Sequence, residues 1–283
     1  MYLYDFEAFT TPCELHLEAL EHTEADTAAQ KIISHAKQLE YRYGFFRETS
    51  EIYALNHRSK NSHSISDELA GLLKIAFFYT KMTQGVFDIA LSGTLKASFK
   101  APTLEEYHKQ RNALRPFASS EHIYLEGNQL TFSNAFTKID FGGLVKEYAV
   151  DQSVVLLQNL GITSALINFG GDIATYGMCH DTPWRIGIQN PDALNSNLME
   201  VELNNRSLCT SGHSKRYTTI ENEKITHIVG VSQGYAHSKQ ISVIAPTTLD
   251  AGVWSTALLI NPSLPLPEHI QLVCAVPDEL VEL

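Results

Sequence analysis

The alternation of apolar and polar residues gives the first indication of secondary structure in this chain. Residues 2–20 alternate and predict a β-hairpin at the N-terminus. Residues 24–46 and 67–83 carry apolar residues near helical spacing, which predicts two amphipathic helices. Ser66 is a suitable N-cap for the second helix, and Gly85 follows its expected end. The first part of the chain is therefore predicted to join a hairpin to helices.

The middle and the second half of the chain are richer in predicted strands. Two short strands near 122–126 and 129–133 are separated by Gly127-Asn128, which is a hairpin signal. Further strands are expected at 136–140, 164–169, 184–189, 199–204, 206–210, 225–230 and 240–245. Helices are expected at 144–159, ending at Gly161, and at about 249–260. The pattern predicts a mixed α and β fold without a clean domain boundary.

Composition and charge narrow the classes of protein that fit this chain. With 44% hydrophobic and 19% charged residues, its composition is that of an ordinary globular protein. The formal net charge of -11 argues against sequence-independent nucleic-acid binding, which needs clustered Lys and Arg. No apolar run is long enough to span a membrane. The N-terminus lacks the apolar segment of a secretory signal, so we expect a cytoplasmic protein.

The cysteines and histidines do not indicate a metal site of their own. Cys13, Cys179, Cys209 and Cys274 are far apart and form no CxxC pair. Free thiols in a reducing compartment are the simplest interpretation. The twelve histidines show no HxH or HExxH spacing, so we do not predict a zinc site.

Two Gly-Gly pairs stand out because each follows a predicted strand. The segment 138–151 reads KIDFGGLVKEYAVD, and the segment 168–172 reads NFGGD. Because a helix is predicted between their strands, the two strands are expected to be parallel neighbours in a βαβ unit. Both turns would then open on one edge of the sheet, where ligands bind in such folds. The first turn begins a helix whose N-terminus, together with Lys146, would favour an anion such as a pyrophosphate. The alternative is that each pair only permits a tight turn.

Seven short segments, in order along the chain, resemble the ApbE family of flavin transferases. They are residues 9–15 (FTTPCEL), 50–56 (SEIYALN), 85–90 (GVFDIA), 140–151 (DFGGLVKEYAVD), 168–172 (NFGGD), 184–191 (WRIGIQNP) and 210–212 (TSG). These correspond to family segments such as Gly-x-Phe-Asp and Asp-Leu-Gly-Gly-Ile-Ala-Lys-Gly-Tyr-Ala-Val-Asp. On this resemblance the chain is identified as a divergent member of the family.

The resemblance implies a fold and a reaction. The fold is α+β, with two interlocked subdomains of mainly antiparallel sheet and packed helices, related to the T-fold. We therefore expect residues 1–283 to form one ApbE-like flavin transferase domain, with FAD as the substrate in a cleft between the subdomains. A magnesium ion bridges to its pyrophosphate, a Ser or Thr hydroxyl of an acceptor flavoprotein attacks the FMN phosphorus, and AMP leaves. Such a transfer depends mainly on positioning and charge neutralisation.

The resemblance also implies roles for particular residues of this chain. Lys146, Asp250 and Thr256 are the candidate catalytic residues. The candidate metal ligands are the Val145 carbonyl, Asp250 and Thr256. The candidate cofactor-binding residues are Asn56, Asp88, Gly142, Gly143, Lys146, Gly170, Gly171, Asp172, Thr210, Ser211, Gly212 and His227.

The chain departs from the family pattern in the late helix. The family reads Ala-Asp-Ala-Leu-Ala-Thr-Ala-Leu there, whereas residues 251–258 read AGVWSTAL. Alignment on Thr256 puts Gly252 where the family has its metal-binding Asp. Asp250 lies two residues earlier, about 200° round an ideal helix. It replaces the missing ligand only if it lies in the loop before the helix; otherwise it is an N-cap for a helix starting near Ala251.

Three further departures affect expected carboxylates. Gly230 stands where the family has Asp, and His213 stands where it usually has Asp. Glu147 replaces the glycine after the turn lysine; its carboxylate would repel a pyrophosphate unless it points away or helps to hold a metal. Losing carboxylates should lower the affinity for magnesium, which prefers oxygen ligands.

Two hypotheses about function follow from these matches and departures. The first is a metal-dependent transferase, or a relative that hydrolyses FAD to FMN and AMP. The second is a catalytically impaired member that binds FAD or another nucleotide, or assists flavoprotein maturation. The ordered motifs, Lys146 and Thr256 favour the first hypothesis, and the missing carboxylates favour the second.

Overall fold

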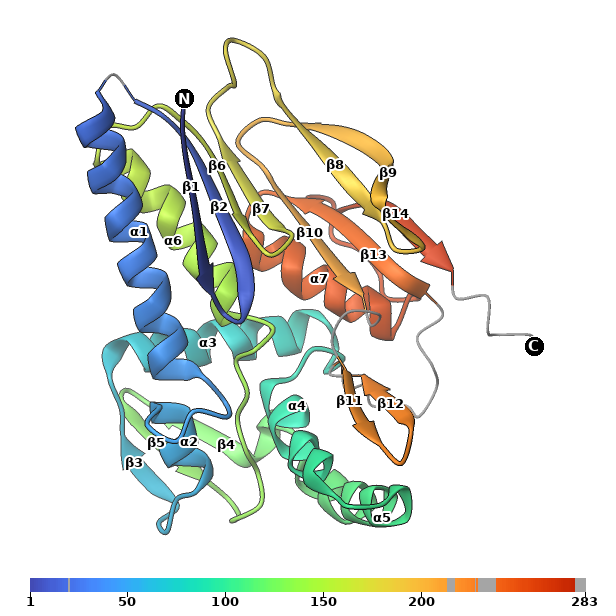
Figure 1. Ribbon diagram of the computed structural model, residues 1–283. Coiled ribbons are helices and arrows are strands. Elements are labelled where there is room, and N and C mark those ends of the chain that lie inside the picture. Colours follow the sequence, from blue (N-terminus) through green and yellow to red (C-terminus); the bar gives the residue numbers. More distant parts are fainter. Residues whose placement is uncertain (20, 213–216, 227, 229–237, 278–283) are drawn as a thin grey trace.

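A seven-stranded antiparallel sheet is the centre of the upper part of the molecule in Figure 1. In this computed structural model all residues of 1–283 are described except 20, 213–216, 227, 229–237 and 278–283. The order of the strands is β1-β2-β6-β7-β10-β13-β14, and each neighbouring pair is antiparallel. The strands are β1 Tyr2–Ala8, β2 Thr11–Glu18, β6 Ser164–Phe169, β7 Asp172–Tyr176, β10 Ser207–Gly212, β13 Ser238–Ala245 and β14 Gln271–Pro277.

Three helices cover one face of this sheet, and a β-hairpin covers the other. The helices are α1 His22–Tyr43, α6 Val145–Asn159 and α7 Thr248–Ile260 (Figure 1). The hairpin is β8 Trp184–Asn190 with β9 Ala193–Leu203. Because side chains alternate along a strand, Ile167 of β6 packs into the helix-covered core while its neighbour Leu166 packs with Trp184.

The second part of the molecule, in the lower half of Figure 1, is mainly helical. Its helices are α2 Glu51–Asn56, α3 Asp67–Met82, α4 Ile89–Leu95 and α5 Leu104–Leu114, with 3₁₀ turns η1 Lys96–Lys100, η2 Arg115–Phe117 and η3 Ser120–His122. A small antiparallel sheet has the order β3 Ser62–Ser64, β5 Gln129–Phe132 and β4 Ile123–Glu126. The hairpin of β11 Tyr217–Ile220 and β12 Glu223–Thr226 reaches α5, where Glu221 accepts a hydrogen bond from Leu104 N at 2.9 Å.

Most of the predicted elements are confirmed. The α+β fold, the N-terminal hairpin and the four long helices are present, and Ser66 caps α3 by accepting from Leu69 N at 3.2 Å. Gly127-Asn128 joins β4 to β5 as expected. The predicted strand 225–230 is shorter, because β12 ends at Thr226 and several residues beyond it lie outside the described ranges. The short helices α2, α4 and α5 and the strands β7 and β14 were not predicted.

The predicted βαβ unit is wrong. Residues 136–140 are not a strand, and β6 pairs antiparallel with β2 and β7 instead. Ile139 is buried and Phe136 is exposed, and side chains replace ladder hydrogen bonds along part of the backbone. Asn56 binds both the N–H and the carbonyl of Ile139, and Thr94 Oγ1 accepts from Lys138 N at 2.9 Å. The sequence of this segment therefore did not distinguish a strand from an irregular segment that is held by side chains.

None of the helices in the described part of the chain combines the length and apolar character needed to cross a bilayer.

Asp151 of α6 fixes the start of α7. Its carboxylate accepts hydrogen bonds from Thr248 N at 2.7 Å and Leu249 N at 3.0 Å. Burial raises the pKa of Asp151 to about 6, although these two N–H donors oppose the rise. A carboxyl whose folded pKa lies above its unfolded value stabilises the fold at low pH, and this contribution is lost as the pH rises through about 6.

We predict that the free energy of unfolding of the wild type, relative to Asp151→Asn, falls by roughly 2 kcal/mol between pH 4 and pH 7. The Asn side chain keeps an acceptor for the helix but does not titrate. Urea unfolding of both proteins across this pH range measures the difference. Parallel stability curves would contradict the assignment of a raised pKa to Asp151.

Candidate functional site

The stretch from Asp140 to Glu147 enters α6 through the first Gly-Gly turn, and buried polar contacts hold it in place. Asp140 forms an ion pair with Lys96 and accepts from Ser92 Oγ at 2.9 Å and Gly142 N at 2.9 Å. Burial alone would raise the pKa of Asp140, but the Lys96 ammonium and these donors lower it. These contacts of the Asp140 carboxylate stabilise the turn.

Two of the predicted cofactor-binding residues, Asn56 and Asp88, are buried in the scaffold next to this segment. Asn56 donates to the carbonyl of Ile139 at 2.8 Å and accepts from its N–H at 2.7 Å. Asp88 is the N-cap of α4, accepting from Ala90 N at 2.7 Å, and it binds Ser120 N at 2.9 Å. Both side chains are buried. Their polar atoms hold the scaffold beneath the turn.

The first Gly-Gly turn leads directly into α6. The carbonyl of Phe141 accepts from Leu144 N and Val145 N, both at 2.9 Å, and α6 begins at Val145. Gly142 is exposed and Gly143 is half-buried, so the backbone of this turn lies at the surface. A helix N-terminus reached by an exposed turn is suited to bind an anion.

The second Gly-Gly pair is the two-residue turn between β6 and β7. Gly170 and Gly171 have φ values of +64° and +96°, as the commonest tight hairpin turn requires. A side chain at Gly170 would also overlap Thr11. The turn type therefore explains both glycines without a ligand. Its location matters for the site, because it places Phe169 and Asp172 beside α6.

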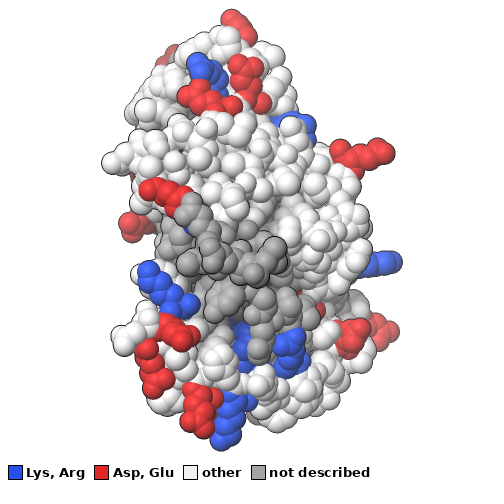
Figure 2. Space-filling model, turned by 90° about the vertical axis from the view of Figure 1, so that its right-hand side faces the viewer, with Lys and Arg blue, Asp and Glu red and all other residues white. Residues whose placement is uncertain are grey.

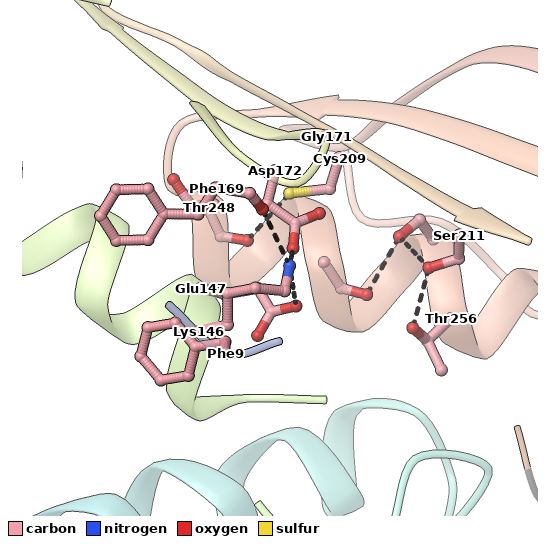
Figure 3. A network of polar contacts seen from close by, with 12 residues as sticks. Phe9, Lys146, Glu147, Phe169, Gly171, Asp172, Cys209, Ser211, Thr248 and Thr256 are labelled. Atoms are coloured by element: carbon pink, nitrogen blue, oxygen red, sulfur yellow. Dashed lines mark hydrogen bonds and ion pairs between the residues drawn. The ribbon is translucent and has the colours of Figure 1, made fainter. Parts of the chain in front are cut away.

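Lys146 joins the two turns (Figure 3). Its ammonium forms an ion pair with Asp172, lies 3.5 Å from Glu147 Oε1 and donates to the carbonyl of Phe169 at 3.4 Å. Only 11% of the Lys146 side chain is exposed. The two Gly-Gly turns are thus neighbours, as predicted, although an antiparallel hairpin and not a βαβ unit brings them together.

The side chain of Glu147, in the first turn of α6, packs against Gly252 of α7. It is 6% exposed, and its Oε2 has no hydrogen-bond partner among the residues that the structure describes. A Cβ added at Gly252 would lie 2.5 Å from Glu147 Cγ, so the glutamate side chain fills the space above this glycine. Burial, and then the Glu147 carboxylate, raise the pKa of the nearby Cys209 thiol.

A group of hydroxyls lies where the end of β10 meets α7 (Figure 3). Ser211 Oγ is 2.8 Å from Ser255 Oγ and 2.9 Å from Thr256 Oγ1. Gly252 and Thr256 are four residues apart and share one face of α7. Thr210 Oγ1 lies 2.9 Å from Ser242 Oγ. Gly212 is the last residue of β10, and a Cβ added there would lie 3.0 Å from the carbonyl oxygen of Lys239. Ser255 was not among the predicted site residues; its only signal in the sequence was its position next to Thr256.

Asp250 is not part of the cluster around Lys146. It accepts hydrogen bonds from Tyr79 Oη and Thr247 Oγ1, both at 2.9 Å, and His269 Nε2 lies 4.0 Å away. Thr247 is the N-cap of α7, whose first residue is Thr248, so Asp250 lies in the first turn of the helix. The helix starts three residues before the predicted start near Ala251, and the Asp250 side chain points towards Tyr79 of α3.

Three residues discussed from the sequence, His213, His227 and Gly230, lie outside the described ranges. The expected role of His227 in cofactor binding therefore stays a prediction.

The donor set around Lys146 fits a hard divalent cation that is shared with a ligand. The carboxylates of Glu147 and Asp172 and the hydroxyls of Ser211 and Thr256 offer oxygen atoms as ligands, and one buried Glu147 oxygen has no partner among the residues that the structure describes. Within the described ranges, no three His, Cys, Asp or Glu side chains could hold a metal by themselves. Magnesium is commonly bound by one or two carboxylates together with substrate phosphates and water.

The surface charge does not favour a polyanion as the partner. On the face drawn in Figure 2, the described Lys and Arg side chains are interspersed with Asp and Glu, without a continuous basic patch. This agrees with the formal net charge of -11.

Comparison with known proteins gives a consistent result. The profile described as the ApbE family matches residues 9–272. The FAD:protein FMN transferase of Vibrio cholerae serotype O1 is 26% identical over 212 residues, covering 72% of this chain and 63% of the relative. That of Salmonella typhimurium is 25% identical over 229 residues, covering 76% of this chain and 65% of the relative. The chain thus matches less than two thirds of the length of these two relatives.

Solved structures show the same fold. The ApbE protein of Thermotoga maritima superposes with a TM-score of 0.83 at 21% identity, covering 92% of this chain and 86% of that one. The flavin transferase ApbE of Vibrio cholerae superposes with a TM-score of 0.77, covering 92% and 87%. Because the family profile spans nearly the whole chain, this protein belongs to the ApbE family.

Proposed function

We propose that this protein transfers FMN from FAD to a Ser or Thr hydroxyl of an acceptor flavoprotein, with release of AMP. Family membership and relatives named FAD:protein FMN transferase support this reaction. The observation that carries the proposal is the position of Lys146, a nearly buried cation where the N-terminus of α6 meets the β6–β7 turn. Such a site offers positive charge and backbone N–H groups to a pyrophosphate.

In this proposal Lys146 and the Gly142-Gly143 turn bind the phosphates of FAD. The exposed backbone of the turn lets the pyrophosphate approach the start of α6, because glycine has no Cβ to obstruct it. When the phosphates arrive, the Lys146 ammonium exchanges part of its contact with Asp172 for them. Asn56, Asp88 and Asp140 would serve the site through their buried backbone contacts, which hold the scaffold around the turn.

Thr256 and the Val145 carbonyl are proposed to hold magnesium together with the FAD phosphates. The metal would neutralise charge that develops on the phosphorus oxygens during transfer. Thr256 Oγ1 is already held by Ser211 at 2.9 Å, which fixes its orientation. The acceptor hydroxyl oxygen forms a bond to the FMN phosphorus, the bond from that phosphorus to the AMP oxygen breaks, and the hydroxyl proton is lost to solvent.

Gly252 supports a second candidate function. Because this position carries no carboxylate, metal binding through α7 alone is weaker than in a helix with Asp there. The protein would then bind FAD without transferring FMN, or hydrolyse it slowly with water as the acceptor.

The first test is to titrate the purified protein with FAD, with and without Mg²⁺, and to separate the products by chromatography. We expect FAD to bind and AMP to appear only with Mg²⁺ and a Ser- or Thr-containing acceptor. FMN and AMP in equal amounts without an acceptor would identify the hydrolase. Absence of FAD binding would contradict the proposed function.

Lys146→Ala is expected to weaken FAD binding by roughly 10- to 100-fold, because a charge-assisted contact to phosphate is lost. Flavin fluorescence during titration measures this affinity. Lys109→Ala is the matched control, since Lys109 is 77% exposed and forms an ion pair with Glu106 at the surface. Equal affinities of Lys146→Ala and wild type, with both proteins folded, would place the phosphates elsewhere.

Asp250→Asn distinguishes a metal ligand from a structural residue. The contacts of Asp250 with Tyr79 and Thr247 favour the structural role. We therefore expect metal-dependent release of AMP to persist and the free energy of unfolding to fall by about 1 kcal/mol. Loss of metal-dependent turnover in a variant with normal thermal stability would instead make Asp250 a ligand.

A further inference from the structure

We propose that Glu147 supplies, from α6, the metal-binding carboxylate that this chain lacks at position 252 of α7. The inference rests on the proposed function, because the cation is the one that accompanies FAD. It names a ligand within that site that the family pattern places on a different helix. Both departures, Glu147 for a glycine and Gly252 for an aspartate, then have a single explanation.

The first observation is steric. A Cβ at Gly252 would lie 2.5 Å from Glu147 Cγ, 3.2 Å from Cδ and 3.3 Å from Oε1. Carbon atoms do not approach to 2.5 Å without displacement, so a side chain at position 252 and the present position of Glu147 exclude each other. The glutamate therefore occupies the volume that an aspartate on α7 would use.

The second observation is the unsatisfied oxygen. Glu147 is 6% exposed, and Oε2 has no hydrogen-bond partner among the described residues. Oε1 lies 3.5 Å from Lys146 Nζ, and no other ion pair of Glu147 is present in the described part of the chain. A buried carboxylate oxygen without a partner is unfavourable unless a cation or donor binds it. A divalent cation that arrives with FAD would satisfy it.

The third observation concerns the local charge. Lys146 forms its closest ion pair with Asp172, so one ammonium faces two buried carboxylates. A cation bound by Glu147 would offset this excess negative charge, and it would release Lys146 to bind the phosphates. The expected repulsion between Glu147 and a pyrophosphate is then replaced by a metal bridge.

The position of the cation follows from α7. Gly252 and Thr256 share one face of the helix, and Glu147 lies over Gly252. Gly252 and Thr256 are one helical turn apart, so the Glu147 carboxylate over Gly252 and the Thr256 hydroxyl that Ser211 binds belong to the same face of α7. A carboxylate and a hydroxyl at this spacing, completed by phosphate oxygens and water, suit a hard divalent cation such as magnesium or manganese.

The test compares Mn²⁺ binding by FAD-saturated protein in four forms: wild type, Glu147→Gln, Glu147→Gly/Gly252→Asp and Asp250→Asn. The paramagnetic resonance signal of free Mn²⁺ measures the affinity without relying on catalysis. FAD affinity without metal is measured separately by flavin fluorescence.

We expect Glu147→Gln to weaken Mn²⁺ binding at least tenfold while metal-free FAD affinity stays within a few-fold of wild type. The swapped double variant should recover Mn²⁺ affinity, because it returns a carboxylate to the same space from α7. Asp250→Asn should bind Mn²⁺ like wild type. Gly252→Asp alone should melt several degrees below the double variant, because it collides with Glu147.

Unchanged Mn²⁺ affinity of Glu147→Gln would overturn the inference, and so would a folded double variant that binds Mn²⁺ no better than Glu147→Gln. In both cases the proposed function stands, provided that wild type binds FAD and releases AMP. Failure of wild type to bind FAD would instead contradict the proposed function itself.

Discussion

The contact between the Lys146 ammonium and Asp172 is the interaction on which the candidate site depends. It ties the N-terminus of α6 to the β6–β7 turn, in addition to the packing of α6 on this part of the sheet. Around this contact lie a helix N-terminus, a backbone carbonyl from Phe169 and the carboxylate of Glu147. An ammonium held among oxygen atoms at a helix start marks a place suited to phosphate and to a divalent cation.

Several polar residues that the sequence pointed to turn out to build the platform beneath this contact. Asn56 binds the backbone of Ile139, Asp88 caps α4, and Asp140 shapes the glycine turn. Each is buried, and each satisfies backbone groups that would otherwise lack a partner. The contacts of Asn56 and Asp140 support the irregular path of residues 139–142 that leads to Lys146, and those of Asp88 support the neighbouring start of α4.

The helices and the N-terminal hairpin could be predicted because periodic burial is a local property of the sequence. The pairing of β6 with β2 could not, since these strands lie far apart along the chain, and a segment held by Asn56 can be mistaken for a strand. The same limit applies to Glu147 and Gly252. Read separately, each is a departure from the family pattern; only the contact between α6 and α7 relates them.

The most direct test of this account is the location of Mn²⁺ by anomalous diffraction in crystals grown with FAD. We predict one peak bound directly by Glu147 and the Thr256 hydroxyl, bridging to a pyrophosphate at the start of α6 with Lys146 beside it. A peak elsewhere, with Glu147 still facing only Lys146, would contradict the assignment of this cluster as the metal and phosphate site.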